Sequence, residues 1–159
     1  MSASVIAVGV DGSAASDLAL QVAVDDARQS GSTVRAITAW VGVGPYSPEM
    51  IMVEPDLSAA QAALIQKRAI ERVLGGVDDP PEVEERIVEG GPGPALVKAA
   101  AGASRLVVGS VHKGVLKRVT EGSTSAYCAR HSQIPVLVVP FVQAAYTEAS
   151  AVAEPTTAD

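Results

Sequence analysis

Five short, mostly aliphatic runs spaced along the chain are the feature that most limits its fold. The first run, residues 5–10, is apolar on both faces and ends at the turn residues Asp11 and Gly12, a pattern typical of a strand buried on both sides. The core must be aliphatic, because apolar residues make up 48% of the chain and aromatic residues only 3%. The other runs occupy residues 34–41, 83–88, 105–109 and 134–140.

Helical segments separate these runs. Ser13 is a suitable N-cap, apolar residues follow it at helical spacing, and Gly31 can take the left-handed conformation that ends a helix. Further helices are predicted at about 58–74, 94–103 and 123–131. Strands that alternate with helices require right-handed crossovers and a sheet covered on both sides. We therefore predict an α/β, Rossmann-like fold: an open five-stranded parallel sheet with helices on both faces.

The length of 159 residues suits a single domain, which we place at residues 1–142. Residues 143–159 form a polar, Ala-rich segment that contains no Lys or Arg. Two interpretations of this segment stay open. It is either a loosely held tail or a short docking helix that uses Phe141, Val142 and Tyr146.

Charge and cysteine content exclude several classes of function. The formal charge is −6, whereas nucleic-acid and anionic-membrane binders usually present basic surfaces, so we expect neither partner. A single cysteine, Cys128, allows no intrachain disulfide. The first residues lack a positive region, and the apolar run after them is too short for a signal peptide or a membrane span. The expected location is cytoplasmic.

Ligands of open parallel sheets bind beyond the carboxyl ends of the strands, where the strand order reverses. Three predicted strand ends carry turn residues there: Asp11, Gly90–Gly91 and Gly109–Ser110. The chain has no Gly-x-x-x-x-Gly-Lys-Ser/Thr loop, and no Gly-x-Gly-x-x-Gly follows the first strand, so P-loop and dinucleotide-binding domains are disfavoured. From the residues alone, Asp11 is either a turn-forming cap or a ligand contact.

The segment 109–123 joins the fourth strand to the last helix and is unusually basic for an acidic chain. It contains Lys113, Lys117 and Arg118, three of the 12 Lys and Arg residues. The cluster fits an anion site, and it also fits an ordinary solvated loop.

Catalytic and metal sites are not predicted. The two histidines, His112 and His131, belong to no Gly-x-Ser-x-Gly elbow or comparable arrangement, so no Ser–His–Asp triad is expected. One cysteine and two histidines nineteen residues apart do not form a metal-ligand set.

Several motifs, taken in order, resemble the universal stress protein family over residues 4–140. They are Val-Gly-Val-Asp-Gly-Ser at 8–13, Ala-Trp at 39–40, Val-Glu-Gly-Gly-Pro at 88–92, Leu-Val-Val-Gly-Ser at 106–110 and Ile-Pro-Val-Leu-Val-Val-Pro at 134–140. The resemblance implies the adenine-nucleotide alpha-hydrolase-like form of the α/β fold. It also implies a stress-response dimer that binds an adenine nucleotide and hydrolyses ATP slowly at most.

ATP-binding members of that family carry Gly-x2-Gly-x9-Gly-Ser/Thr after the fourth strand. Gly109 and Gly122–Ser123 match this pattern here, but His112 replaces the middle glycine. If the position needs a positive φ or a close approach to phosphate, the side chain is unfavourable. The imidazole could instead hydrogen-bond a phosphate. AMP and cyclic AMP are therefore rivals to ATP, which would bring Mg²⁺ with it.

The resemblance assigns roles to particular residues. Asp11 would contact the adenine or ribose edge, Ala39 the adenine, and Val108 with Gly109 the ribose, while the phosphates would meet the residues of the last loop and helix. The predicted nucleotide-binding set is Asp11, Gly12, Ser13, Ala39, Val108, Gly109, Ser110, His112, Gly122, Ser123 and Thr124. A homodimer would form through the strand at 134–140. The alternative function is an interaction protein of the same fold that binds no nucleotide and acts through its dimer surface.

Overall fold

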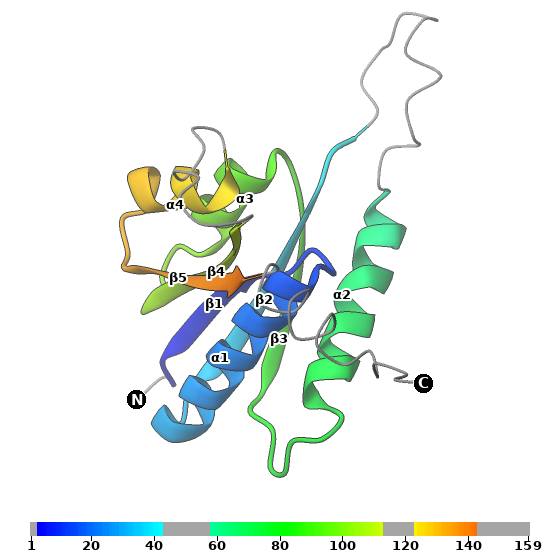
Figure 1. Cartoon of the computed structure of the whole chain (residues 1–159), viewed down its shortest axis with the longest axis vertical. Coiled ribbons are helices and arrows are strands. Elements are labelled where there is room, and N and C mark those ends of the chain that lie inside the picture. Colours follow the sequence, from blue (N-terminus) through cyan, green and yellow to red (C-terminus); the bar gives the residue numbers. More distant parts are fainter. Residues whose placement is uncertain (1–2, 43–57, 113–122, 143–159) are drawn as a thin grey trace, which may run out of the picture.

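The computed structural model describes residues 3–42, 58–112 and 123–142, with His112 described by its backbone alone. Strands and helices alternate strictly along these ranges (Figure 1). In chain order they are β1 (Val5–Gly9), α1 (Ala14–Ser30), β2 (Thr33–Trp40), α2 (Ala59–Leu74), β3 (Val83–Glu89), α3 (Pro92–Ala99), β4 (Arg105–His112), α4 (Thr124–His131) and β5 (Val136–Val142).

All paired strands are parallel, and their order across the sheet is β3-β2-β1-β4-β5. Helices α1 and α2 pack on one face of the sheet, and α3 and α4 pack on the other (Figure 1). The predicted open, five-stranded parallel α/β fold is confirmed. None of the helices in the described ranges combines the length and the apolar character needed to cross a membrane.

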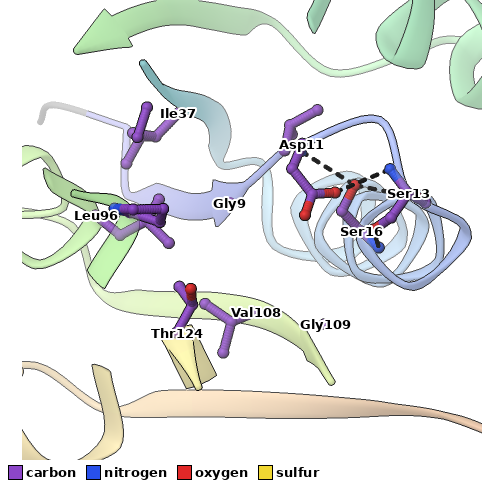
Figure 2. A pocket seen from close by; sticks show the side chains of 12 residues that line it. Gly9, Asp11, Ser13, Ser16, Ile37, Leu96, Val108, Gly109 and Thr124 are labelled. Atoms are coloured by element: carbon purple, nitrogen blue, oxygen red, sulfur yellow. Dashed lines mark hydrogen bonds between the residues drawn. The ribbon is translucent and has the colours of Figure 1, made fainter. Parts of the chain in front are cut away.

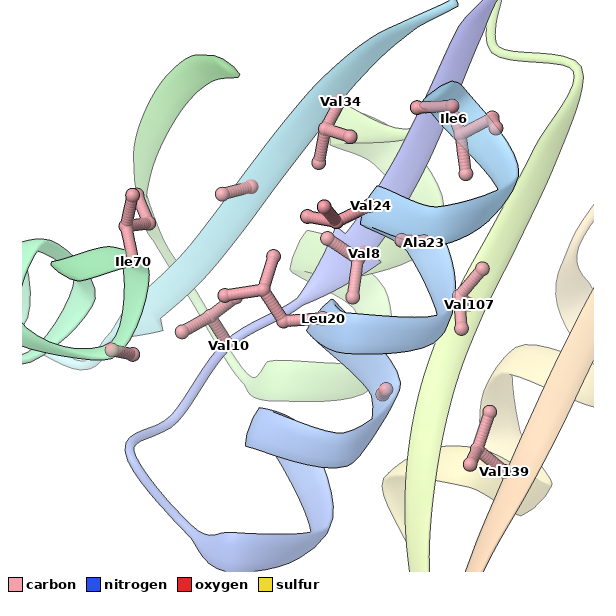
Figure 3. Packing of buried hydrophobic residues seen from close by; sticks show 14 residues of the cluster. Ile6, Val8, Val10, Leu20, Ala23, Val24, Val34, Ile70, Val107 and Val139 are labelled. Carbon is pink, nitrogen blue, oxygen red and sulfur yellow. The ribbon is translucent and has the colours of Figure 1, made fainter. Parts of the chain in front are cut away.

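Strand β1 lies at the centre and supplies side chains to both halves of the core. Ile6 and Val8 point to the face covered by α1, where they pack with Leu20 and Val24 (Figure 3). Ala7 points the opposite way and joins the cluster under α3 and α4. All three β1 side chains are fully buried. This two-sided burial explains why the first apolar run shows no alternation of polar and apolar residues.

The helix ends follow the predicted capping signals. The Ser13 hydroxyl accepts a hydrogen bond from the N–H of Ser16, and Gly31 ends α1 with a φ of 69°. Ser58 and Gln61 form a reciprocal capping box at the start of α2. Local sequence therefore fixes where α1 and α2 begin, and α1 directs its first turn toward the carboxyl end of β1.

Three elements, β4, β5 and α3, have boundaries that differ from the sequence-based expectation. Strands β4 and β5 continue side by side to His112 and Val142, because each extends the parallel pairing of the other. Helix α3 begins earlier, at Pro92, since proline suits the first helical turn. It ends at Ala99 rather than near Ala103, where a tight turn to Gly102 (φ 82°) follows. The predicted tail at 143–159 lies outside the described residues.

Candidate functional site

The strand order reverses between β1 and β4, and a pocket opens there beyond the carboxyl ends of the strands (Figure 2). Its cavity volume is about 140 Å³. Residues from β1, β2, β4 and three helix starts line it: Gly9, Val10, Asp11, Ser13, Ser16, Ile37, Ala39, Pro92, Leu96, Val108, Gly109 and Thr124. The pocket occupies the position where open α/β sheets bind ligands.

The inner wall of the pocket is apolar. Ile37 on β2, Leu96 on α3 and Val108 on β4 are all buried and belong to one core cluster. Gly9 makes room for this wall, because a Cβ at that position would lie 2.9 Å from Leu96 Cδ1. The wall therefore offers a dry surface suited to a flat, apolar ring.

Gly109 has a structural reason to be glycine. A Cβ there would lie 2.4 Å from the carbonyl oxygen of Ala15, so any larger residue would force the first turn of α1 away from β4. The absence of a side chain brings the start of α1 directly over the strand end. Gly109 thus shapes the pocket by allowing helix α1 to approach.

The turn after β1 holds Asp11 through a closed set of hydrogen bonds, drawn as dashed lines in Figure 2. The N–H of Ser13 donates to Asp11 Oδ1 at 2.9 Å, and the N–H of Asp11 donates to Ser16 Oγ at 3.2 Å. Ser16 Oγ in turn donates to the Ser13 carbonyl oxygen at 3.2 Å. The second carboxylate oxygen of Asp11 has no partner among the described residues. Asp11 is therefore both a turn former and an oriented hydrogen-bond acceptor at the pocket.

Helix α4 begins on the opposite side of the pocket. Ser123 caps it by accepting a hydrogen bond from the N–H of Ala126, and Thr124 lines the cavity. The first N–H groups of a helix lack intrahelical partners and carry partial positive charge. This end of the pocket therefore favours an anionic or oxygen-rich group, whereas the Asp11 end favours a hydrogen-bond donor.

The structure brings together six of the eleven predicted site residues around the pocket: Asp11, Ser13, Ala39, Val108, Gly109 and Thr124. Gly12, Ser110 and Ser123 are neighbours of lining residues in the chain but do not line it themselves. Gly122 lies outside the described residues, as do Lys113, Lys117 and Arg118.

His112 occupies extended strand backbone in β4, paired with Val142. Asp79 is the one non-glycine residue of the described ranges with a positive φ. The backbone at position 112 therefore does not require glycine. On the sequence alone, His112 is unfavourable if this position needs a positive φ. It needs none, because strand β4 continues through position 112, the place of the middle glycine in the Gly-x2-Gly-x9-Gly-Ser/Thr motif.

Sequence reasoning missed six lining residues: Gly9, Val10, Ser16, Ile37, Pro92 and Leu96. Three of them carry a usable signal. Ile37 lies two residues before Ala39 and so shares its face of β2, and Leu96 lies four residues after Pro92 on one face of α3. Ser16 could have been found as the first-turn residue bonded to the Ser13 cap.

Titratable groups are sparse at the pocket, where Asp11 is the one formally charged residue among the described lining residues. Burial raises the pKa of the Cys128 thiol, so this buried side chain stays protonated and is no nucleophile at neutral pH. Within the described part of the chain, no three His, Cys, Asp or Glu residues are grouped closely enough to hold a metal ion. The arrangement is suited to binding and offers no evident acid–base pair.

Fold and pocket place the chain among the open, doubly wound α/β domains. The chain belongs to the universal stress protein family, whose model matches residues 3–140. Among curated relatives, universal stress protein Rv2005c of Mycobacterium tuberculosis is 34% identical over 136 residues, which cover 84% of this chain and 44% of the relative. The chain thus spans less than half the length of the curated relatives it matches.

Two solved structures of similar length share the fold. A universal stress protein crystallised in complex with cAMP is 30% identical, with a TM-score of 0.63 and coverage of 88% of this chain and 98% of its own. The protein Rv1636 of Mycobacterium tuberculosis is also 30% identical, with a TM-score of 0.52 and coverage of 87% and 97%.

Proposed function

We propose that this chain binds an adenine nucleotide in the pocket at the β1–β4 switch point and serves as a nucleotide-dependent stress-response module. One observation carries the proposal. The pocket combines an apolar wall, an oriented carboxylate and a helix N-terminus within one cavity at the carboxyl ends of the strands. The cAMP complex of a relative 30% identical to this chain supports it.

The three features fit the three parts of a nucleotide. The adenine ring would lie against Ile37 and Leu96, with Ala39 leaving space for it on β2. The free oxygen of Asp11 would accept a hydrogen bond from a ribose hydroxyl or from the exocyclic amine. The first turn of α4 would receive phosphate oxygens beside Thr124.

Charge favours a nucleotide with few phosphates. Among the lining residues that the structure describes, Asp11 carries the one formal charge, which is negative, and the whole chain carries a formal charge of −6. Each additional phosphate is therefore disfavoured unless Mg²⁺, or the basic residues Lys113, Lys117 and Arg118 of the segment 109–123, offset its charge. We expect cyclic AMP and AMP to bind more tightly than ATP.

Self-association is the second part of the proposal. Strand β5 is an edge of the sheet, and it exposes Leu137, Val138 and Val142 by 43%, 39% and 52%. Apolar side chains on an unpaired edge favour pairing with a second copy. The same surface supports the alternative function, an interaction protein that works through its dimer face without nucleotide.

A cytoplasmic location and the domain limits at 1–142 stay predictions.

The test is calorimetric titration of nucleotide-stripped protein with cyclic AMP, AMP and ATP, the last with and without Mg²⁺. Wild-type binding to one or more of them is the expected result. Ala39→Leu should abolish binding by filling the ring site, while Ala63→Leu on the exposed side of α2 should leave it unchanged. Absence of binding by the wild-type chain at millimolar nucleotide would reject the proposal in favour of the interaction protein.

Asp11→Asn tests the orientation of the ligand. The variant keeps a carbonyl oxygen for the Ser13 N–H but replaces the free oxygen with an amide group. We expect affinity to fall about tenfold or more, since hydrogen bonds to a charged group are worth about 1.5–3 kcal/mol. Equal nucleotide affinity of the wild-type chain and Asp11→Asn would mean that Asp11 only forms the turn.

A further inference from the structure

The peptide unit between Val10 and Asp11 is held by side-chain hydroxyl groups at both of its polar atoms. The Thr38 hydroxyl donates to the Val10 carbonyl oxygen at 2.7 Å, in a buried hydrogen bond across from β2. The N–H of Asp11, on the same peptide unit, donates to Ser16 Oγ at 3.2 Å. The orientation of this peptide plane sets the direction in which the Asp11 side chain leaves the backbone.

Gln66 on α2 determines the direction of the Thr38 hydrogen bond. Its Nε2 lies 3.0 Å from the Ala36 carbonyl oxygen and 3.1 Å from that of Arg86. Since carbonyl oxygens only accept, the nitrogen of the amide must face them. The same Nε2 lies 2.9 Å from Thr38 Oγ1, so its two hydrogens are shared among three acceptors. Because the amide nitrogen cannot accept, the single Thr38 proton is left for the Val10 carbonyl oxygen.

Ser16 is fixed in a comparable way on the other side. Its own proton goes to the Ser13 carbonyl oxygen, so Ser16 Oγ is free to accept the N–H of Asp11. The N–H of Ser13 then returns to Asp11 Oδ1, which closes the set. Gly12, with a φ of 82°, lies between them, and a Cβ there would be 2.8 Å from Ile65 of α2. Helix α2 therefore contacts the turn directly as well as through Gln66 and Thr38.

The polar groups of Gln66 and Thr38 are buried, and their desolvation lowers the stability of the fold. Gln66 is fully buried and Thr38 is 2% exposed, and Gln66 Oε1 has no hydrogen-bond partner in the part of the chain that the structure describes. Valine has nearly the shape of threonine and would fill the Thr38 site on β2 without a polar group. A buried hydroxyl that carries a desolvation penalty is expected to have a specific task.

We propose that Thr38 and Ser16 are positioning residues that clamp the Val10–Asp11 peptide and so aim the Asp11 carboxylate into the pocket, with Gln66 holding the Thr38 hydroxyl in place. This proposal rests on the proposed nucleotide site. Because Gln66 and Ile65 belong to α2, the position of that helix sets the geometry of the Asp11 turn.

Thr38→Val and Thr38→Ser form the matched pair that tests the clamp in the full chain. Thr38→Val keeps the volume and removes the hydroxyl, and the two Nε2 hydrogens of Gln66 retain the carbonyl oxygens of Ala36 and Arg86. Thr38→Ser keeps the hydroxyl and loses a methyl group. We expect the affinity for cyclic AMP to fall about fivefold to tenfold in Thr38→Val and to change less than about twofold in Thr38→Ser.

Urea unfolding of both variants separates positioning from stability. The clamp is supported if the two variants lose similar stability but only Thr38→Val, which lacks the hydroxyl, loses affinity for cyclic AMP. If the loss of affinity is instead proportional to the loss of stability in both variants, whether or not the hydroxyl is present, Thr38 only supports the fold and the proposal is overturned. Ser16→Ala should also weaken cyclic AMP binding, whereas Ser30→Ala, which removes an exposed hydroxyl at the far end of α1, should not.

Hydrogen exchange of the Asp11 amide, measured without nucleotide, distinguishes failure of the clamp from failure of the nucleotide site. Faster exchange in Thr38→Val than in wild type, with wild-type exchange in Thr38→Ser, supports the clamp even if no nucleotide binds. Unchanged exchange in Thr38→Val overturns the clamp even if the wild-type chain binds cyclic AMP.

Discussion

The two edges of the sheet have opposite chemistry although both are parallel strands of seven residues. Strand β3 reads Val-Glu-Glu-Arg-Ile-Val-Glu, and strand β5 reads Val-Leu-Val-Val-Pro-Phe-Val. On β3, Glu84 forms ion pairs with Arg86 of the same strand and with Arg35 of β2. On β5, all the exposed side chains are apolar, and Pro140 among them lacks a backbone N–H donor.

Whether an edge strand can pair with another chain therefore depends on its side chains and not on its place in the fold. Charges along an edge oppose pairing with another strand, because a second backbone would have to desolvate them. Pro140 removes a single donor from β5 and leaves the rest of the edge able to pair. One edge of the molecule is thus protected, and the other is suited to a partner.

The largest expected effect comes from placing a charge on the apolar edge. Leu137→Lys should raise the dissociation constant of the proposed dimer about 100-fold or more, because a charge at the centre of an interface must be desolvated without a partner. Sedimentation equilibrium over a concentration series measures this constant. Leu64→Lys is the control, since Leu64 is equally exposed, at 46%, but lies on α2. A monomeric wild-type chain, or equal effects of both substitutions, would contradict pairing through β5.

The second expected effect comes from removing charged side chains from the β3 edge. The double substitution Glu85→Val and Arg86→Val, both at exposed positions, makes this edge resemble β5. We expect association beyond the dimer, because a molecule with two apolar edges can continue the sheet in both directions. Light scattering against concentration detects the larger species. A size distribution like that of wild type would show that the β3 charges do not protect the edge.

The sequence predicts more of the sheet than of the pocket, and the two edges show why. The apolar runs and capping serines are local signals, so all five strands, the helix starts at Ser13 and Ser58, and the apolar character of β5 could be found from them. The pairing of β4 with β5 through His112 depends on contact between separate segments. No local pattern marks where such pairing stops.

The same distinction applies to the site. Asp11, Ala39 and Gly109 stand at strand ends or in recognisable motifs, and all three line the pocket. Leu96 enters it because α3 packs against Gly9, and Thr38 reaches Val10 from a neighbouring strand. Such contacts arise only when distant elements pack together, and a single sequence does not show which residues meet.

The smallest expected effect is a pH dependence confined to the charged edge. The hydrogen bond from Arg35 holds the pKa of Glu84 below its ordinary value of 4.5, with Arg86 adding to the effect. Since the folded pKa is lowered, the ionised Glu84 stabilises the fold above pH 4.5, and this contribution is lost as pH falls through the lowered folded pKa. Glu84→Gln should cost about 0.5–1 kcal/mol at neutral pH, a small value because the pair is partly exposed to solvent.

Urea unfolding of wild type and Glu84→Gln from neutral to acid pH measures this effect, with Glu85→Gln at an exposed neighbouring position as the control. The difference between wild type and Glu84→Gln should shrink in acid, while Glu85→Gln should follow wild type throughout. Leu137→Ala on β5 should instead change stability by the same amount at every pH, because β5 has no titratable side chain. A difference for Glu84→Gln that stays constant with pH would mean that the ion pairs with Arg35 and Arg86 do not stabilise the β3 edge.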